Sequence, residues 1–269
     1  MSAVNPTRRL FHRLRHGGLA WLYGAVRQRI APARPGFGAA AANRLRGGRG
    51  LEIGGPSGLF SRRGGVPAYA WAAHLDNVNF AAATAWESGL RDGGEFRYDA
   101  AQPIGRQFLR EAVALQGITD HAYDFILSSH CLEHVANPLA ALREWRRVTR
   151  PGGHLLLALP DPSRTFDHRR PVTTLAHLRD DFNRQTGEDD LTHLPEILAL
   201  HDLARDPGAG SPAEFAARSC ANILNRCLHH HVFDLALVRA IIAESGWEIV
   251  AAESLAPLHL VAWARNPAA

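Results

Sequence analysis

A glycine-rich segment directly after a short apolar stretch is the first place where this sequence could do chemistry. Residues 51–53 predict a buried strand, and Glu52-Ile53-Gly54-Gly55-Pro56-Ser57-Gly58 carries that strand into a turn. Glycines at the end of a strand let the backbone turn tightly and approach a ligand, because no Cβ stands in the way. The segment therefore indicates a loop that holds a nucleotide-like ligand.

A carboxylate follows the glycine segment at a meaningful distance. Residues 69–75 predict a second strand, which ends at Asp76 and is followed by Asn77. An acid about 20 residues beyond a glycine loop accepts hydrogen bonds from ribose hydroxyls in nucleotide-binding folds. We therefore expect Asp76, with Asn77 beside it, to hold the sugar of a nucleotide.

Histidine, the usual general base near neutral pH, is concentrated in the second half of the chain. Residues 161–234 hold seven of the 15 histidines: His168, His177, His193, His201, His229, His230 and His231. His168 is our first choice of base because Asp167 can orient it, and His130, His134 and His201 are further candidates. The alternative is that each of these rings only satisfies backbone groups or binds acceptor hydroxyls.

Metal ligation is the competing use of the same residues. His193 and His201 are eight positions apart with Glu196 between them, and a divalent cation could lower the pKa of an acceptor hydroxyl. The sequence has no His-Glu-x-x-His segment, and Cys220 and Cys227 lack zinc-finger spacing. We therefore expect no metal site.

Alternating strands and helices would bring these residues together. Strands are predicted at 51–53, 69–75, 123–127 and 154–159, and apolar residues at three- and four-residue steps predict a helix at 138–148. This alternation is typical of a doubly wound α/β sheet, whose ligands lie at the carboxyl ends of the strands. The third strand leads directly into Ser129 and His130.

The ordered set of segments resembles the successive motifs of class I S-adenosylmethionine-dependent methyltransferases. The resemblance covers residues 48–162 and is carried by the glycine segment, Asp76, Glu111-Ala112, Tyr123-Asp124-Phe125, Leu132-Glu133-His134 and Arg147-Val148-Thr149-Arg150-Pro151-Gly152-Gly153. It implies a Rossmann-like seven-stranded sheet with helices on both faces and a final antiparallel hairpin. Residues 247–254 and 258–264 are suitable for that hairpin.

The same resemblance implies S-adenosylmethionine as cofactor and S-adenosylhomocysteine as product. Carried over by motif, the residues implied at the methionine end of the cofactor are Glu52, Gly54, Gly55, Pro56 and Ser57. Asp76 and Asn77 are implied at the ribose, and Glu111 and Ala112 at the adenine. Ser129 and His130 are implied beside the sulfonium. Pro56 stands where the family usually has a glycine, which leaves the local geometry of the loop open.

An insertion at residues 161–234 should choose the acceptor. Helices are predicted at 174–182, 194–202 and 212–218, so the insertion is mainly helical, and a further helix is predicted at 234–245. Segments 128–134, 165–173 and 229–233 resemble bacterial methyltransferases of surface-polysaccharide or glycan assembly. That likeness, with the Asp, His and Arg content, implies O-methylation of a sugar hydroxyl on a small-molecule or glycan acceptor.

Positive charge is concentrated at the start of the chain. All 30 basic residues are arginine, and residues 1–50 hold ten of them and no acid, whereas the formal net charge is only +4. Residues 8–30 predict an amphipathic helix that can either lie on an anionic membrane surface or pack on the domain. We expect an arm and linker at 1–47, with 31–50 a loose loop, and a methyltransferase domain at 48–269.

Composition limits the classes of protein. Three cysteines are too few for a disulfide framework, which favours a cytoplasmic protein, peripheral at the inner membrane face if the arm binds lipid. The sequence has no run of 18 apolar residues, so it predicts no spanning helix, and Arg27 and Arg29 disfavour a signal peptide.

The alternative functions are a natural-product methyltransferase acting on oxygen, nitrogen or carbon, a cofactor-binding scaffold without catalysis, and a nucleic-acid-binding protein. The acidic body disfavours the last of these.

Overall fold

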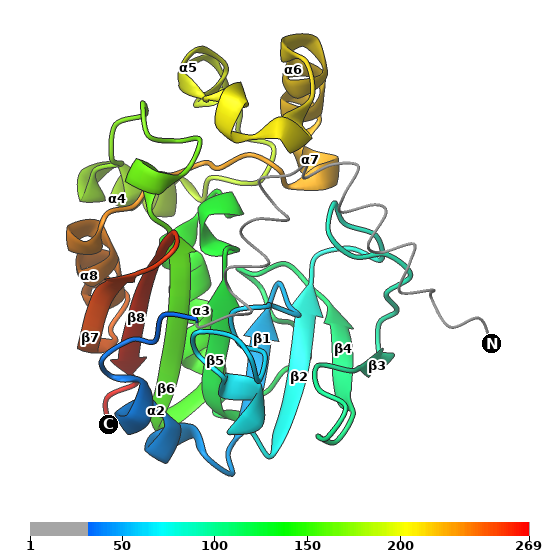
Figure 1. Ribbon diagram of the computed structural model, residues 1–269, viewed down its shortest axis with the longest axis vertical. Coiled ribbons are helices and arrows are strands. Elements are labelled where there is room, and N and C mark those ends of the chain that lie inside the picture. Colours follow the sequence, from blue (N-terminus) through cyan, green and yellow to red (C-terminus); the bar gives the residue numbers. More distant parts are fainter. Residues whose placement is uncertain (1–31, 269) are drawn as a thin grey trace.

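The computed structural model describes residues 32–268, which form an α/β fold around one central sheet (Figure 1). Its eight strands lie in the order β3-β4-β2-β1-β5-β6-β8-β7. The strands are β1 (Arg49–Ile53), β2 (His74–Asn79), β3 (Glu95–Phe96), β4 (Gly105–Leu109), β5 (Tyr123–Ser129), β6 (Thr149–Pro160), β7 (Glu248–Leu255) and β8 (His259–Arg265). The five strands β4, β2, β1, β5 and β6 run parallel, and β8, β7 and β3 are antiparallel to their neighbours.

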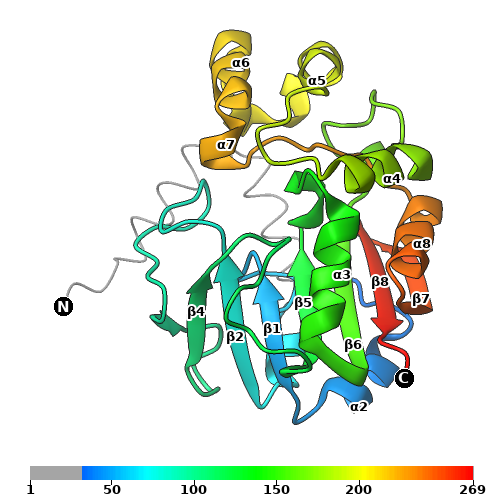
Figure 2. The same cartoon turned by 180° about the vertical axis from the view of Figure 1, so that it is seen from behind.

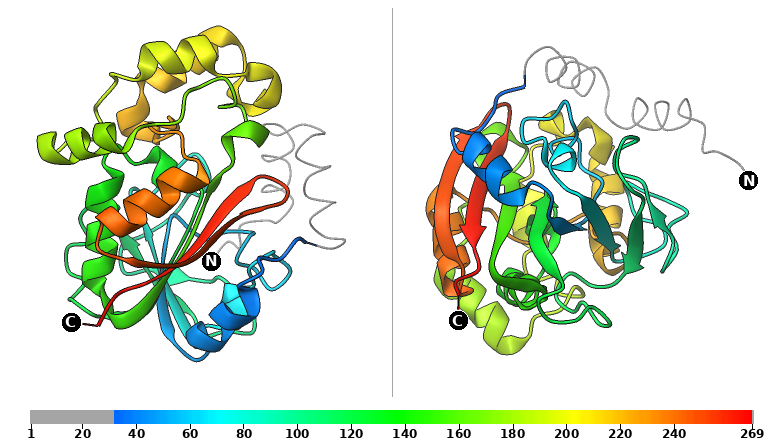
Figure 3. Two further views of the ribbon diagram at one scale, coloured as in Figure 1. Left: turned by 90° about the vertical axis from the view of Figure 1, so that its left-hand side faces the viewer. Right: turned by 90° about the horizontal axis from the view of Figure 1, so that it is seen from below.

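Helices cover both faces of this sheet, and each face has its own apolar core. The helices are α2 (Gly38–Leu45), α3 (Pro138–Val148), α4 (Leu175–Arg184), α5 (Leu194–Leu200), α6 (Pro212–Cys220), α7 (Asn222–Asn225) and α8 (Leu235–Glu244). Trp145 of α3 and Ile241 of α8 pack into one core, and Leu45 of α2 packs into the other with Phe125. Figure 2 shows α3 in front of the sheet, and Figure 3 shows α2 on the opposite face.

Most of the predicted elements are confirmed. The expected Rossmann-like sheet is present with its final antiparallel hairpin, β7 and β8, and it gains one short strand, β3, at its edge. Helix α3 has the predicted bounds, because Asn137 caps it and Pro138 occupies its first turn. The predicted helices of the insertion correspond to α4, α5 and α6, and the one after it corresponds to α8.

The strand predicted at 69–75 is wrong. Residues Ala68–Ala70 form a short 3₁₀ helix, and β2 begins only at His74. Apolar runs of this length are buried in either conformation, so their pattern does not distinguish a strand from a helical turn. As a consequence Asp76 lies in the middle of β2, and the strand ends at Asn79.

The loose loop predicted at 31–50 is also wrong in part. Residues Gly38–Leu45 form α2, whose Ala41, Ala42 and Leu45 are buried against the sheet. Alanine is the strongest helix former, and its small side chain lets a helix approach a sheet closely. This part of the predicted arm and linker therefore packs on the body of the fold, whereas the predicted amphipathic helix at 8–30 lies outside the described residues.

The insertion stands above the carboxyl edge of the parallel strands (Figures 1 and 3). It has a small core of its own, made by Ile197, Ala209, Phe215 and Leu228. Three short 3₁₀ helices interrupt it at Pro162–Arg164, Leu203–Arg205 and Pro207–Ala209, and a fourth, Leu132–His134, follows β5 below it. Within residues 32–268, no helix has the length and apolar character needed to cross a membrane.

Candidate active site

A cavity of about 590 Å³ lies at the carboxyl edge of the sheet, below the insertion. Parallel strands place their carboxyl ends at one edge, which is where ligands of doubly wound folds bind. Most of the predicted cofactor residues line this cavity: Gly54, Gly55, Pro56, Ser57, Glu111, Ala112, Ser129 and His130. Glu52, Asp76 and Asn77 do not.

Glu52 and Asn77 support the glycine loop from below. The backbone N–H of Gly55 donates to Oδ1 of Asn77 (3.1 Å), and Asn77 returns a hydrogen bond to the Gly55 carbonyl (3.2 Å). The backbone N–H of Ser57 donates to Oε1 of Glu52 (3.2 Å), and the Tyr69 hydroxyl donates to Oε2 (2.7 Å). Both side chains are fully buried, and these hydrogen bonds hold the loop in its shape.

Burial also changes the acidity of Glu52. It raises the pKa of this carboxyl to about 8, although the hydrogen bonds from Tyr69 and Ser57 act in the opposite direction. The folded protein therefore holds a proton on Glu52 near neutral pH.

Gly54 opens the floor of the cavity. Its φ of +82° is favourable only for glycine, and a Cβ at this position would come within 3.0 Å of Sγ of Cys131. The turn after β1 therefore needs glycine both for its backbone conformation and for the space above Cys131.

Asp76 has a structural role away from the cavity. Its carboxylate accepts hydrogen bonds of 2.8 Å from the Arg49 guanidinium, the Tyr123 hydroxyl and the Arg106 backbone N–H, and it lies 2.8 Å from Nε2 of His74. Burial opposes ionisation, but these donors outweigh it and lower the pKa of Asp76. The position at the end of β2 belongs to Asn79, which lines the cavity.

The predicted catalytic pair Asp167 and His168 is separated. Nε2 of His168 pairs with Asp202 (2.8 Å), whereas Asp167 pairs with Arg170 (3.1 Å) and with Nδ1 of His229 (2.5 Å). Residues 166–169 form a turn, in which neighbouring side chains point in different directions, so adjacency in the sequence does not pair Asp167 with His168. Neither Asp167 nor His168 lines the cavity.

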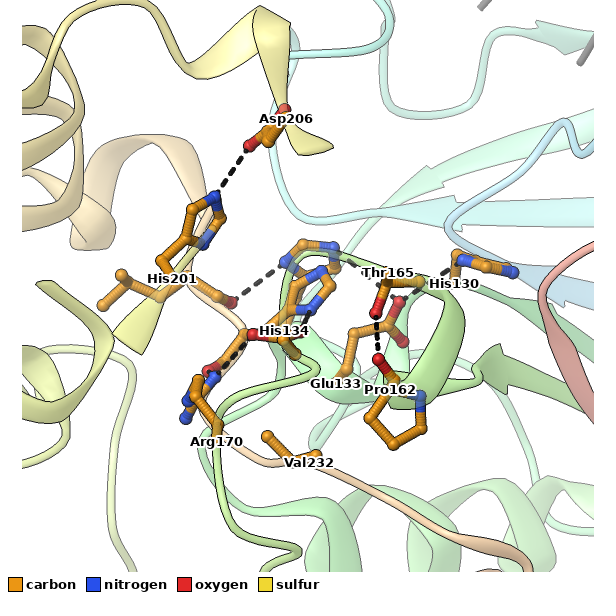
Figure 4. Close-up of polar contacts among 12 residues, drawn as sticks. His130, Glu133, His134, Pro162, Thr165, Arg170, His201, Asp206 and Val232 are labelled. Atoms are coloured by element: carbon orange, nitrogen blue, oxygen red, sulfur yellow. Dashed lines mark hydrogen bonds and ion pairs between the residues drawn. The ribbon is translucent and has the colours of Figure 1, made fainter. Parts of the chain in front are cut away.

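His201 also lies outside the cavity. Its ring stacks on Phe166 (4.4 Å between ring centroids) and pairs through Nε2 with Asp206 (3.2 Å; Figure 4). These contacts hold the insertion together.

A compact group of polar side chains forms the cavity wall after β5. His130 follows Ser129, and Glu133 and His134 belong to the 3₁₀ helix Leu132–His134. Oε1 of Glu133 lies 3.8 Å from Nδ1 of His130 and 4.0 Å from Nε2 of His134 (Figure 4). His229 joins this group from the far end of the insertion, with its ring centroid 4.6 Å from that of His134.

Arg226, which also lines the cavity, connects the insertion to the loops that follow β2 and β4. The Arg226 guanidinium donates to Glu111 (2.7 Å) and lies over the Phe80 ring (5.1 Å). The Trp86 ring is half-exposed at the rim and lies 5.1 Å from the His134 ring.

Sequence reasoning did not select Glu133, His229, Asn79 or Arg226 as site residues. In the sequence Glu133 stands only within a motif, and His229 stands only within a histidine-rich set. Nearly a hundred positions separate them, so no local spacing could have paired them. Asn79 could have been found from the sequence, because it is the last residue of the second buried strand, and ligands bind at the carboxyl ends of such strands.

Comparison with known families identifies this arrangement. Residues 25–252, most of the chain, match the methyltransferase domain family. The chain belongs to this family. It is an S-adenosylmethionine-dependent methyltransferase, as the order of its motifs implied.

Individual relatives of this methyltransferase are distant or partial. The ubiquinone biosynthesis O-methyltransferase of Parvibaculum lavamentivorans is 34% identical over 111 residues, which span 40% of this chain and 38% of that relative. Among solved structures, a methyltransferase from Mesorhizobium loti is 16% identical with a TM-score of 0.49, covering 85% of this chain and 95% of its own. One from Methanosarcina mazei is 15% identical with a TM-score of 0.47, covering 86% and 98%.

The cavity of this methyltransferase fits its cofactor. Its volume lies in the range of cofactor sites, and the absent Cβ of Gly54 leaves room above the floor. Asn79 supplies an amide to the cavity at the end of β2, and Phe80 and Ala112 supply apolar surface. Ser129 and His130 border the same space from β5.

Proposed function

We propose that this methyltransferase acts on a hydroxyl oxygen of a sugar or glycan intermediate, with His130 as general base. The observation that carries the proposal is that His130 and His134 line the same cavity as the glycine loop, with the buried carboxylate of Glu133 3.8 Å from His130 and 4.0 Å from His134. A hydroxyl must lose its proton to become a good nucleophile, and a positioned imidazole is suited to accept it. The cofactor supplies an electrophilic methyl group on a sulfonium.

His130 has the position and the free lone pair that such a base needs. Nε2 of His130 hydrogen-bonds with Nδ1 of His259 (2.7 Å). With the Nε2 proton donated to His259, Nδ1 keeps its lone pair and faces the side of Glu133. Burial, together with the nearby His259 and His229, lowers the pKa of His130 to about 3, so the ring is neutral near pH 7 and its Nδ1 lone pair is unprotonated.

A phenolic hydroxyl is the second candidate acceptor. Its support is the aromatic surface of the cavity, where Trp86 and Phe80 offer rings to a flat molecule. The partial relative from Parvibaculum lavamentivorans is named a ubiquinone biosynthesis O-methyltransferase.

The test is transfer of a radiolabelled methyl group from S-adenosylmethionine to two acceptor panels. One panel holds nucleotide sugars and free and lipid-linked oligosaccharides, and the other holds catechols and quinols. We expect labelled sugar O-methyl ethers, and we expect His130→Gln to lower kcat by about 10²–10⁴-fold. The matched control is His168→Gln, because His168 is partly exposed and paired with Asp202 outside the cavity.

Three results would overturn parts of this proposal. Labelling confined to the phenolic panel replaces the sugar acceptor with the second candidate. Methylation of nitrogen or carbon refutes the hydroxyl acceptor. A silent His130→Gln beside an inactive His168→Gln returns the base to the residue that the sequence favoured.

A further inference from the structure

Glu133, His134 and His229 form a cluster with the composition of a metal site. Each offers one ligand atom, and these atoms all lie within 4.8 Å of one another. His134 itself lines the cavity, so the cluster borders the space where substrate binds. Figure 4 shows Glu133 between His130 and His134.

The hydrogen bonds behind the two rings fix which nitrogen faces the cluster. Nδ1 of His134 lies 3.0 Å from the Leu228 carbonyl, which can only accept, so this nitrogen carries the proton. Nδ1 of His229 likewise donates to the Asp167 carboxylate, which the Arg170 guanidinium holds in its charged form. In the neutral form of each ring, Nε2 therefore keeps its lone pair. Metal-binding histidines show this same arrangement, with a carboxylate or carbonyl behind the ring.

Glu133 provides an independent observation. Its residue is fully buried, yet neither carboxylate oxygen has a hydrogen-bond partner among residues 32–268. A buried carboxylate without donors is costly, and proteins normally pair it with a donor or a cation. The nearest nitrogens, at 3.8 and 4.0 Å, are too far for hydrogen bonds. The 4.0 Å between Oε1 of Glu133 and Nε2 of His134 can be spanned by one ion, because Zn²⁺ bonds to nitrogen and oxygen are about 2.0–2.2 Å long.

We propose that Glu133, Nε2 of His134 and Nε2 of His229 bind a divalent transition metal, with Zn²⁺ the best match to two imidazoles and one carboxylate. Three protein ligands leave a coordination position open, as in catalytic zinc sites. Because His134 lines the cavity, that position is available to the acceptor, and the ion lowers the pKa of the acceptor hydroxyl. This role of the ion rests on the proposed O-methyl transfer, whereas the binding of the ion does not.

The proton and electron balance of the assisted transfer is simple. The acceptor oxygen loses its proton to His130 and forms a bond to the methyl carbon. The bond between that carbon and sulfur breaks, and its electron pair stays on sulfur. The metal changes no oxidation state.

A second histidine cluster serves as the internal comparison. His177, His193 and His231 also bring ligand atoms within 4.8 Å. Here, however, Nε2 of His177 and Nε2 of His193 hydrogen-bond to each other (2.9 Å), and Nε2 of His231 donates to the Ala136 carbonyl (3.1 Å). These contacts already use the nitrogens, which is why we assign the metal to the first cluster.

The test is titration of the chelator-treated, full-length protein with Co²⁺, read by its visible absorption, and with Zn²⁺ in competition. We expect one Co²⁺ per chain and an absorption change when an acceptor-like alcohol is added. Glu133→Gln and His229→Asn should weaken binding at least 100-fold, and Asp167→Asn by about 10–100-fold, the usual effect of losing a carboxylate behind a ligand. His177→Asn and His168→Asn are controls that should bind Co²⁺ normally.

Thermal unfolding without metal guards against misfolded variants. Glu133→Gln removes an unpartnered buried charge, so the metal-free variant should melt at or above the temperature of the metal-free parent. Absence of Co²⁺ binding by the folded parent overturns the site. Binding that survives Glu133→Gln but is lost in His177→Asn also overturns it, in favour of the second cluster. Normal Co²⁺ binding by a protein that methylates no hydroxyl leaves the metal site standing and refutes only the proposed function.

Discussion

Glu52 matches a motif position, and the structure places its side chain beneath the glycine loop and not in the cavity lining. Its place before the glycine loop suggested a ligand to the methionine end of the cofactor, but its carboxyl group is buried beneath the loop. Any residue larger than glycine at position 55 would collide with this side chain, since a Cβ on Gly55 would lie 2.2 Å from Cδ of Glu52. The acid and the glycine therefore depend on each other.

Glu52 should also make stability depend on pH. Because burial raises its pKa from 4.5 to about 8, the folded state holds a proton that the unfolded chain releases above pH 4.5. Its contribution to the free energy of unfolding is therefore complete below that pH and is lost as pH rises towards 8. Glu52→Gln should flatten this decline by up to about 1.4 kcal/mol per pH unit. Urea unfolding of both proteins from pH 5 to 8 measures the difference, and parallel curves would refute the assignment.

Asp76 and Asn79 lie on the same strand, β2, but we expect Asp76 to support folding and Asn79 to support cofactor binding. Asp76→Asn weakens the hydrogen-bond network with Arg49 and Tyr123, and we expect it to cost about 1–3 kcal/mol of stability while leaving cofactor affinity unchanged. Asn79→Ala should raise the Kd of S-adenosylhomocysteine about tenfold, because it removes an amide from the cavity. Calorimetric titration checks both variants. If Asp76→Asn alone lost affinity, the role predicted from sequence would be restored.

At the scale of elements, prediction succeeded where local chemistry and tertiary burial agree. Helix α3 combines a capping Asn137, a proline in the first turn and an apolar face, so its bounds were predictable. The run around Tyr69 was misassigned because that side chain is buried beneath the glycine loop, a contact that no local pattern encodes. The pairing of His134 with His229 was not predictable for a similar reason, because the two rings meet only where the insertion folds back over β5.

The cap of α8 offers a test at this scale. Asp234 accepts a hydrogen bond from the Leu237 backbone N–H (2.7 Å) at the helix start. Asp234→Ala should lower the free energy of unfolding by about 0.5–2 kcal/mol, since the first-turn amide loses its partner. Asp234→Ser, which keeps a capping oxygen, should recover most of that loss in chemical denaturation. Equal losses in the two variants would contradict the capping role.

At the scale of the whole molecule, Arg226 connects the insertion to the sheet. It is largely buried and pairs with Glu111, and both residues line the cavity. We expect Arg226→Gln to weaken binding of S-adenosylhomocysteine about tenfold, because Glu111 and the Phe80 ring lose the cation that holds them. Arg205→Gln, an exposed arginine elsewhere on the insertion, is the control. Equal affinities in the two variants would show that the insertion closes the cavity without this contact.

The basic arm remains a prediction of the sequence. If residues 8–30 lie on anionic lipid, replacing Arg8, Arg9, Arg13 and Arg15 with glutamine should remove about 1 kcal/mol of binding per arginine. Co-sedimentation with vesicles containing phosphatidylserine measures this loss. An unchanged bound fraction would leave the alternative, an arm that packs on the domain.

The rim of the cavity also gives the protein a built-in optical reporter. Within residues 32–268, Trp86 is 56% exposed, whereas Trp71, Trp145, Trp247 and Trp263 are each exposed by 9% or less. Collisional quenchers such as iodide reach indole rings only where solvent does, so Trp86 supplies the accessible emission from this part of the chain. A ligand that fills the cavity covers that ring. Occupancy can therefore be followed by fluorescence in the unlabelled enzyme, with Trp86→Phe as the silent reference.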